Sequence, residues 1–144
     1  QTGPPRRLYE RPASRFVADF LGETNFLPAI VKNVSNGLVT LETPLGLLSS
    51  TAGGSDVPSG GNVTVSIRPE TWAISKDSHA PATKNQLMGK IARTTYLGEM
   101  AQHQVMVGPD LVMKVFEMNP SPELRDGEMV VISVAYRDVV LLID

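Results

Sequence analysis

The 144-residue sequence contains no cysteine, so neither a disulfide nor a thiolate metal site contributes to its stability. Only 6% of the residues are aromatic and the formal net charge is −2. Nucleic-acid-binding domains need a basic groove and stacking aromatic side chains, so this class of partner is not expected. The longest apolar run near the C-terminus, residues 139–143, is too short to cross a bilayer, and no signal peptide is visible.

The motifs of common catalytic sites are also missing. The phosphate-binding pattern G-x-x-x-x-G-K-[ST] does not occur, and neither does the G-x-S-x-G turn of Ser hydrolases. The two histidines, His79 and His103, are too few to hold a metal, and we predict that both lie at the surface. We therefore expect no catalytic, cofactor-binding or metal-binding residue, and no enzymatic activity in this chain.

One segment of the chain occurs twice. Residues 66–74 return in altered form as residues 133–141, which is 67 positions later. In both copies a glycine precedes an alternating apolar strand, which runs into a charged corner and then a short apolar strand. Residues 27–31 are echoed by residues 87–91 at an offset of 60, so the second copy has gained about seven residues, which we place around 96–104. Such a repeat predicts two similar β-units and favours a binding or regulatory module over a catalytic domain.

The pattern of elements predicts a mainly β protein with two repeated lobes of the OB-fold type, preceded by a short N-terminal helix. Short alternating strands punctuated by turns, such as Asn36-Gly37, indicate the lobes. Pro12 suits the start of the helix and Gly22 its end. Its apolar stripe consists of Phe16, Val17, Phe20 and Leu21. The predicted divisions are a linker and helix at 1–24, a first lobe at 25–76, a hinge at 77–84 and a second lobe at 85–144.

Two charged or aromatic corners are the candidate functional residues. In Arg68-Pro69-Glu70 the proline fixes the backbone, so the flanking charges either bind an anion or a partner subunit, or stabilise the corner itself. We favour the structural role, and we expect Trp72 to share a strand face with Glu70 unless the corner breaks the alternation. The second corner lies at Tyr96 to Glu99, where Tyr96 either covers a lobe edge or contacts a partner. The candidates are Arg68, Glu70, Tyr96 and Glu99.

These residues resemble the C-terminal regulatory part of ATP-binding subunits of bacterial ABC importers. The segments that carry the resemblance are Gln1-x-Gly3-x-Pro5, Leu8-Tyr9-Glu10-Arg11-Pro12, residues 15–22 and Asn25-Phe26-Leu27. Further segments suit the OB-like modules called TOBE domains, namely Ile67-Arg68-Pro69-Glu70, Tyr96-Leu97-Gly98-Glu99, Lys114-Val115-Phe116-Glu117 and Asn119-Pro120. The spermidine/putrescine importers are the most similar members, with iron(III) and sugar importers behind them.

The resemblance implies a piece of a longer protein, in keeping with a chain that opens on Gln1. The parent would be an ATPase that uses ATP and Mg²⁺, lies in the cytoplasm and is peripheral to the inner membrane. Its expected partners are its own nucleotide-binding domain, a second ATPase subunit in a homodimer, and the membrane subunits of the transporter. The stripe at 16–21 would dock on the nucleotide-binding domain. Since the Walker and signature motifs are absent here, no catalytic residue carries over. The alternative is a free module that binds a small oxyanion such as molybdate.

Overall fold

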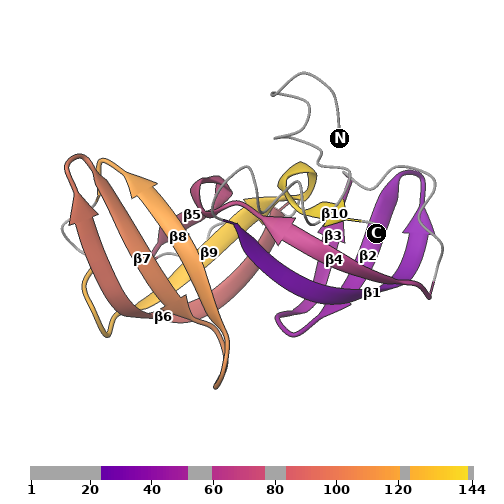
Figure 1. The fold of residues 1–144 in the computed structure, drawn as a ribbon, viewed down its shortest axis with the longest axis horizontal. Coiled ribbons are helices and arrows are strands. Elements are labelled where there is room, and N and C mark those ends of the chain that lie inside the picture. The colour runs from indigo at the N-terminus through magenta and orange to yellow at the C-terminus, as the bar shows by residue number, and fades with distance from the viewer. Residues whose placement is uncertain (1–23, 52–59, 77–83, 121–123, 143–144) are drawn as a thin grey trace. The chain divides into compact units, whose positions relative to one another are not determined.

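The computed structural model describes residues 24–51, 60–76, 84–120 and 124–142 (Figure 1). Within these ranges the chain forms ten strands and two short 3-10 helices, so the mainly β class is confirmed. The expected N-terminal helix, with its stripe at Phe16, Val17, Phe20 and Leu21, lies outside the described residues. The same holds for His79 and for hinge residues 77–83, whereas Lys84 is the first residue of a strand.

The strands form two five-stranded antiparallel sheets. The first sheet has the order β10-β4-β1-β2-β3. Its strands are β1 (Asn25–Ser35), β2 (Leu38–Thr43), β3 (Gly46–Ser50), β4 (Asn62–Ile67) and β10 (Val140–Leu142). The second sheet has the order β5-β9-β6-β7-β8. Its strands are β5 (Ala73–Ser75), β6 (Lys84–Leu97), β7 (Met100–Met106), β8 (Val112–Met118) and β9 (Met129–Ala135).

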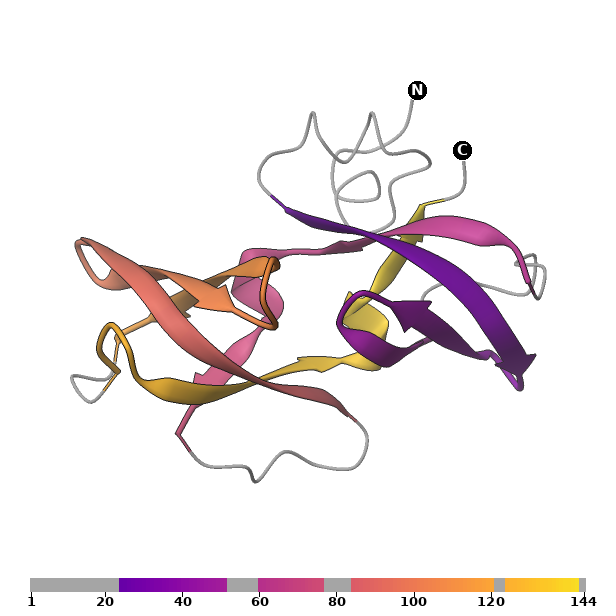
Figure 2. The same ribbon diagram turned by 90° about the horizontal axis from the view of Figure 1, so that it is seen from below.

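The two halves of the chain exchange their closing strands. The 3-10 helix η1 (Pro69–Thr71) follows β4, yet the next strand, β5, pairs with β9 in the second sheet. The helix η2 (Tyr136–Asp138) follows β9, yet β10 pairs with β4 in the first sheet (Figure 2). Of the described residues, those from 24 to 68 and from 136 to 142 therefore form the first unit, and those from 69 to 135 form the second.

This exchange corrects the continuous lobes at 25–76 and 85–144 that the sequence predicted. The residues at 73–75 belong to the second unit, and those at 140–142 belong to the first. After each corner the chain leaves the sheet of the preceding strand and joins the other sheet. Strand periodicity shows that a short strand follows each corner, but it does not reveal which sheet that strand joins.

The internal repeat is reproduced in the backbone. The register of β1 with β2 shifts between Val31 and Asn33, and the register of β6 with β7 shifts between Ile91 and Arg93, 60 positions later. Such a bulge adds an unpaired residue and bends the strand, so it is a specific structural marker. The two units therefore share a bulge at equivalent positions, as the repeat at offset 60 predicts.

Hydrogen bonds beside each bulge also repeat. In the first unit Val31 donates its N–H to the carbonyl of Gly61 (2.9 Å), and its own carbonyl accepts from Gly60 (2.6 Å). In the second unit Ile91 donates to Glu128 (2.9 Å) and accepts from Gly127 (2.7 Å). The glycines are 67 positions apart, so the closing part of the repeat is confirmed as well.

Strand registers locate the extra residues of the second unit. Leu41 and Val105 are the inward-facing residues opposite the two bulges, and they are 64 positions apart. Leu48 and Met113 pair with them in the next strand of each sheet, and these two residues are 65 positions apart. Four of the seven extra residues thus lie in the β6–β7 hairpin, which contains the predicted span 96–104. The others lie farther along the chain.

Alternation along the strands builds the buried core of each unit. In β1, Leu27, Ala29 and Val31 are buried, whereas Pro28 and Ile30 between them are exposed. A period of two places alternate side chains on one face of a sheet. Burial of one such Val, Leu or Ile stabilises the fold by roughly 1.5–3 kcal/mol. The apolar side chains that are at most 1% exposed are Leu27, Val31, Val39, Leu41, Leu48, Val65, Ile67, Ile91, Ala101, Val105, Val115, Val130, Ile132, Val134, Val139 and Leu142.

Candidate functional site

The first candidate corner is a single turn of 3-10 helix. Pro69 is buried, Glu70 is exposed and Arg68 is half-buried. Trp72 follows the turn and is only 4% exposed, so Glu70 and Trp72 face different surroundings. The helical turn breaks the strand alternation, which was the exception allowed for in the sequence-based expectation. The corner thus places one buried aromatic ring next to an exposed carboxylate.

The Trp72 indole carries a polar atom that the corner does not satisfy. Its Nε1–H is buried and has no hydrogen-bond acceptor among the described residues. An unpaired buried donor costs about 1–3 kcal/mol relative to a paired one. The ring therefore stabilises this region through its apolar area, and the N–H offsets part of that gain.

The second candidate corner is the tip of the β6–β7 hairpin. Gly98 has a φ of 63°, which glycine adopts without strain, and it allows the tight turn from Leu97 to Met100. Tyr96 is 59% exposed and Glu99 is exposed, so both side chains are accessible at the hairpin tip. The four candidates belong to two different elements, the 68–70 corner and the 96–99 tip.

A buried polar cluster in the second unit was not predicted. His103 is 1% exposed, so the expectation of a surface position is wrong for this residue. Its Nδ1 lies 2.8 Å from the Thr94 hydroxyl, and its Nε2 lies 3.0 Å from Oε1 of Glu117. An ionised carboxylate only accepts hydrogen bonds, so Nε2 donates to Glu117. Both ring nitrogens of His103 are therefore satisfied.

This hydroxyl–imidazole–carboxylate cluster is structural. The imidazole is enclosed, so no substrate can reach it, whereas a general base must lie within hydrogen-bond reach of the reacting group. A buried polar group that keeps its hydrogen bonds fixes one arrangement of the surrounding strands. A signal for it exists in the sequence, because Ala101, His103 and Val105 follow a period of two and flank the polar Gln102 and Gln104.

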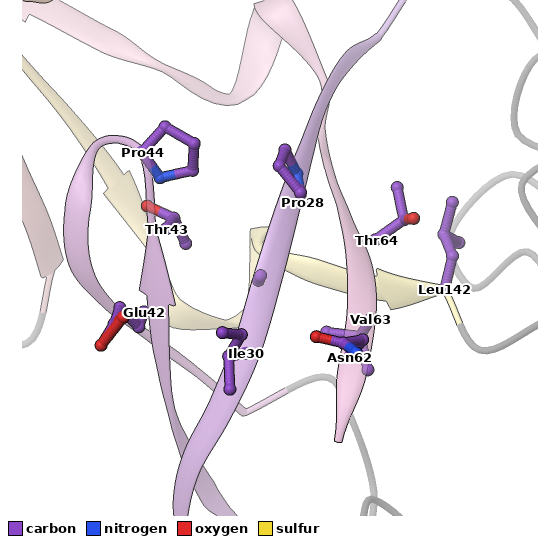
Figure 3. A pocket seen from close by; sticks show the side chains of 10 residues that line it. Pro28, Ile30, Glu42, Thr43, Pro44, Asn62, Val63, Thr64 and Leu142 are labelled. Atoms are coloured by element: carbon purple, nitrogen blue, oxygen red, sulfur yellow. The ribbon is translucent and has the colours of Figure 1, made fainter. Parts of the chain in front are cut away.

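A pocket of about 630 Å³ opens on the outer side of the first sheet (Figure 3). Side chains from four strands and from the turn after β2 surround it. They are Pro28, Ala29, Ile30, Glu42, Thr43, Pro44, Asn62, Val63, Thr64 and Leu142. The carboxylate of Glu42 lies 3.5 Å from the Lys32 ammonium, and both side chains are half exposed. The lining thus combines apolar side chains, two threonines and an asparagine with the single carboxylate of Glu42. The sequence signal for it was the pair Pro28 and Ile30, which are apolar at outward-facing positions of β1.

The described residues hold no group of three or more His, Cys, Asp or Glu side chains that could bind a metal ion. In the same part of the chain, no helix is long and apolar enough to cross a membrane.

Comparison with known protein families and sequences gives consistent matches. The sequence model of the TOBE domain matches residues 65–142, which is more than half of the chain. The spermidine/putrescine import ATP-binding protein PotA of Pseudomonas fluorescens is 40% identical over 108 residues, which are 75% of this chain and 28% of that protein. PotA 1 of Pseudomonas aeruginosa is 33% identical over 145 residues, covering 100% of this chain and 38% of that protein.

An iron importer subunit and a solved structure also match. The Fe(3+) ions import ATP-binding protein FbpC 1 of Rhizobium meliloti is 28% identical over 138 residues, covering 96% of this chain and 36% of that protein. This chain therefore spans well under half the length of these curated relatives. The cytoplasmic molybdate-binding protein ModG superimposes with a TM-score of 0.69 and 13% identity, over 83% of this chain and 96% of that one. At this identity the likeness shows the fold alone.

Proposed function

Since the chain belongs to the TOBE domain family, we propose that it is the regulatory, C-terminal domain of the ATP-binding subunit of an ABC importer. The observation that carries this proposal is the similarity of the whole chain to an importer ATP-binding protein at 33% identity. The parent subunit couples ATP hydrolysis, with Mg²⁺, to the import of a solute. This domain contacts its own nucleotide-binding domain and helps to pair two ATPase subunits. The parent is cytoplasmic and associates with the inner membrane through the membrane subunits.

The proposed solute is a polyamine. Both Pseudomonas relatives carry spermidine/putrescine import in their names, and both are more similar to this chain in sequence identity than the iron importer subunit. Iron and sugars are the other solute classes. The four candidate residues enter this proposal in two roles: Arg68 and Glu70 stabilise the corner, and the exposed Tyr96 and Glu99 form a contact surface at the hairpin tip.

A chimera tests the proposal. The matching segment of the P. fluorescens PotA would be replaced by this chain, and spermidine uptake would be measured in cells that supply the remaining transporter subunits. We expect uptake within a few-fold of the parent. A chimera that folds and hydrolyses ATP but imports no spermidine would contradict the proposal. A chimera that carries an unrelated β domain of similar size is the matched control.

The second candidate is a module that binds a small oxyanion. Its support is the similarity in fold to the molybdate-binding protein ModG. Calorimetric titration of the chain with molybdate tests it, with sulfate as the comparison anion. Saturable binding of molybdate by the isolated chain, together with a chimera that does not transport, would favour this function over the importer.

A further inference from the structure

The two units carry equivalent rows of outward-facing side chains. In the first unit Ile30 pairs with Asn62 on one side and with Glu42 on the other, and Glu42 pairs with Leu47. We call these four residues, together with Pro28, the first face. Residues directly opposite one another in neighbouring strands lie on the same side of a sheet, so this row runs across four strands.

The second unit has the same row at the equivalent positions. Lys90 pairs with Met129 and with Met106, and Met106 pairs with Val112. We call these four residues, together with Met88, the second face. Each member matches one of the first face through the offsets of the repeat: Lys90 takes the place of Ile30, and Met106 takes the place of Glu42.

Exposed apolar side chains concentrate on these two faces. Nine large hydrophobic side chains are exposed among the described residues, and six of them belong to the two faces. They are Ile30 (41%), Leu47 (68%), Met88 (66%), Met106 (41%), Val112 (43%) and Met129 (54%). The other three lie at the end of the β6–β7 hairpin and of β8. A repeated apolar row that faces solvent in both units indicates an interaction surface, and methionine is enriched in the cores of such surfaces.

The faces are complementary in charge. The first face carries the Glu42 carboxylate, whose ion pair with Lys32 is half exposed and weak. The second face carries Lys90, which has no ion-pair partner among the described residues. The first face is hollowed by the pocket that Ile30, Glu42 and Asn62 line, and the second face exposes methionine side chains. The pocket is larger than a methionine side chain.

We propose that the first face of one copy of this chain binds the second face of another copy. Two second faces pressed together would bring Lys90 close to Lys90, whereas a first face offers Lys90 the carboxylate of Glu42. Each copy carries one face of each kind, so each copy offers either face to a partner copy. The proposal names the surfaces through which two ATPase subunits pair, and in that respect it rests on the proposed function.

Reciprocal charge reversal tests the proposal on the 144-residue chain by analytical ultracentrifugation over a range of concentrations. Lys90→Glu alone and Glu42→Lys alone each place like charges against each other wherever a first face meets a second face. We expect each to weaken self-association by roughly tenfold or more. In a one-to-one mixture of the two variants, every contact between unlike variants again joins opposite charges, so mixed species should form with close to wild-type affinity. One variant carries a fluorophore, so that the mixed species is detected directly.

The control is Arg125→Glu, which makes the same change of charge at an exposed position outside both faces and should leave association unchanged. Circular dichroism of each variant shows whether it folds, and the mixture gives a rescue that a folding defect cannot produce. A wild type that stays monomeric, or dimers that neither reversal weakens, would overturn the proposal. If the two faces pair normally but the chimera imports no solute, the importer function is rejected and the pairing of the faces is not.

Discussion

The cores of the two units differ at one equivalent position. In the first unit the inward pair after the bulge is Val34 with Val39, and Val39 is fully buried. In the second unit the corresponding pair is Thr94 with His103, and His103 is buried to the same degree. One backbone arrangement thus accommodates an apolar core and a polar core at the same place.

The difference depends on the residue at one further position of the repeat. The partner of His103 is Glu117, which lies two residues beyond Val115, the residue that pairs with His103. In the first unit Ser50 is the counterpart of Val115, and by the same offset of 65 the counterpart of Glu117 in the sequence is Ala52, whose side chain has no hydrogen-bond acceptor. Glu117 of the second unit therefore provides the acceptor that a buried imidazole needs. The comparison teaches that the glutamate and the histidine form one structural feature.

The largest effect is expected from transferring the histidine without its acceptor. Val39→His would place an imidazole at a fully buried position of the first unit, where the counterpart of Glu117 in the sequence is an alanine, Ala52. We expect it to lower the free energy of unfolding by about 3–5 kcal/mol, because an unpaired polar group is buried and the core is overpacked. Urea unfolding of the chain measures this, with Val39→Leu as a control for size. A loss below about 1 kcal/mol would contradict the comparison.

The reverse exchange should cost less. His103→Val gives the second unit the core residue of the first, but it removes the hydrogen bonds that His103 makes with the Thr94 hydroxyl and with the carboxylate of the partly buried Glu117. We expect a loss of about 2 kcal/mol. The triple variant Thr94→Val, His103→Val, Glu117→Leu should recover most of it, since the three polar groups of the cluster are then replaced together. Equal stabilities for the single and the triple variant would show that the cluster contributes nothing.

Much of the fold was predictable because local backbone chemistry defines it. The Asn36-Gly37 turn has positive φ at both residues, 52° and 81°, as its sequence predicts. The repeat likewise predicted two similar units, and the bulges at Val31 and Ile91 bear this out. The exchange of β5 and β10 was not predictable in this way, because antiparallel pairing partners are chosen by contacts distant in sequence.

The candidate sites were harder to predict than the fold. The buried state of His103 depends on the register of β6 with β7, and a slip of one residue would turn the ring to the outer side. Similarly, Ile30 and Lys90 become members of matching faces only when four strands are aligned. Single strands show alternation, but rows across a sheet require the tertiary structure.

A smaller effect is expected where the units differ by one methyl group. Gly89 is buried and replaces Ala29 of the first unit. A Cβ atom on Gly89 would lie 2.6 Å from Cγ1 of Val105 and 3.0 Å from the carbonyl oxygen of Met106. Gly89→Ala should therefore cost about 1–2 kcal/mol. If the clash with Val105 is the cause, the losses from Gly89→Ala and Val105→Ala should add to more than the loss of the double variant. Strict additivity in urea unfolding would exclude this explanation.

The smallest effect is expected at the corners, where the two copies of the repeat carry different residues at one equivalent position. Arg68 precedes η1 in one corner, and Ala135 precedes η2 in the other, so Arg68→Ala makes the first corner resemble the second. Because Arg68 is half-buried, we expect the loss of its hydrogen bonds to lower the unfolding free energy by about 1 kcal/mol. Self-association, measured by ultracentrifugation, should not change, because Arg68 belongs to neither face. An unchanged melting temperature combined with weaker association would assign Arg68 to the subunit interface, and it would show that the two corners differ in binding rather than in stability.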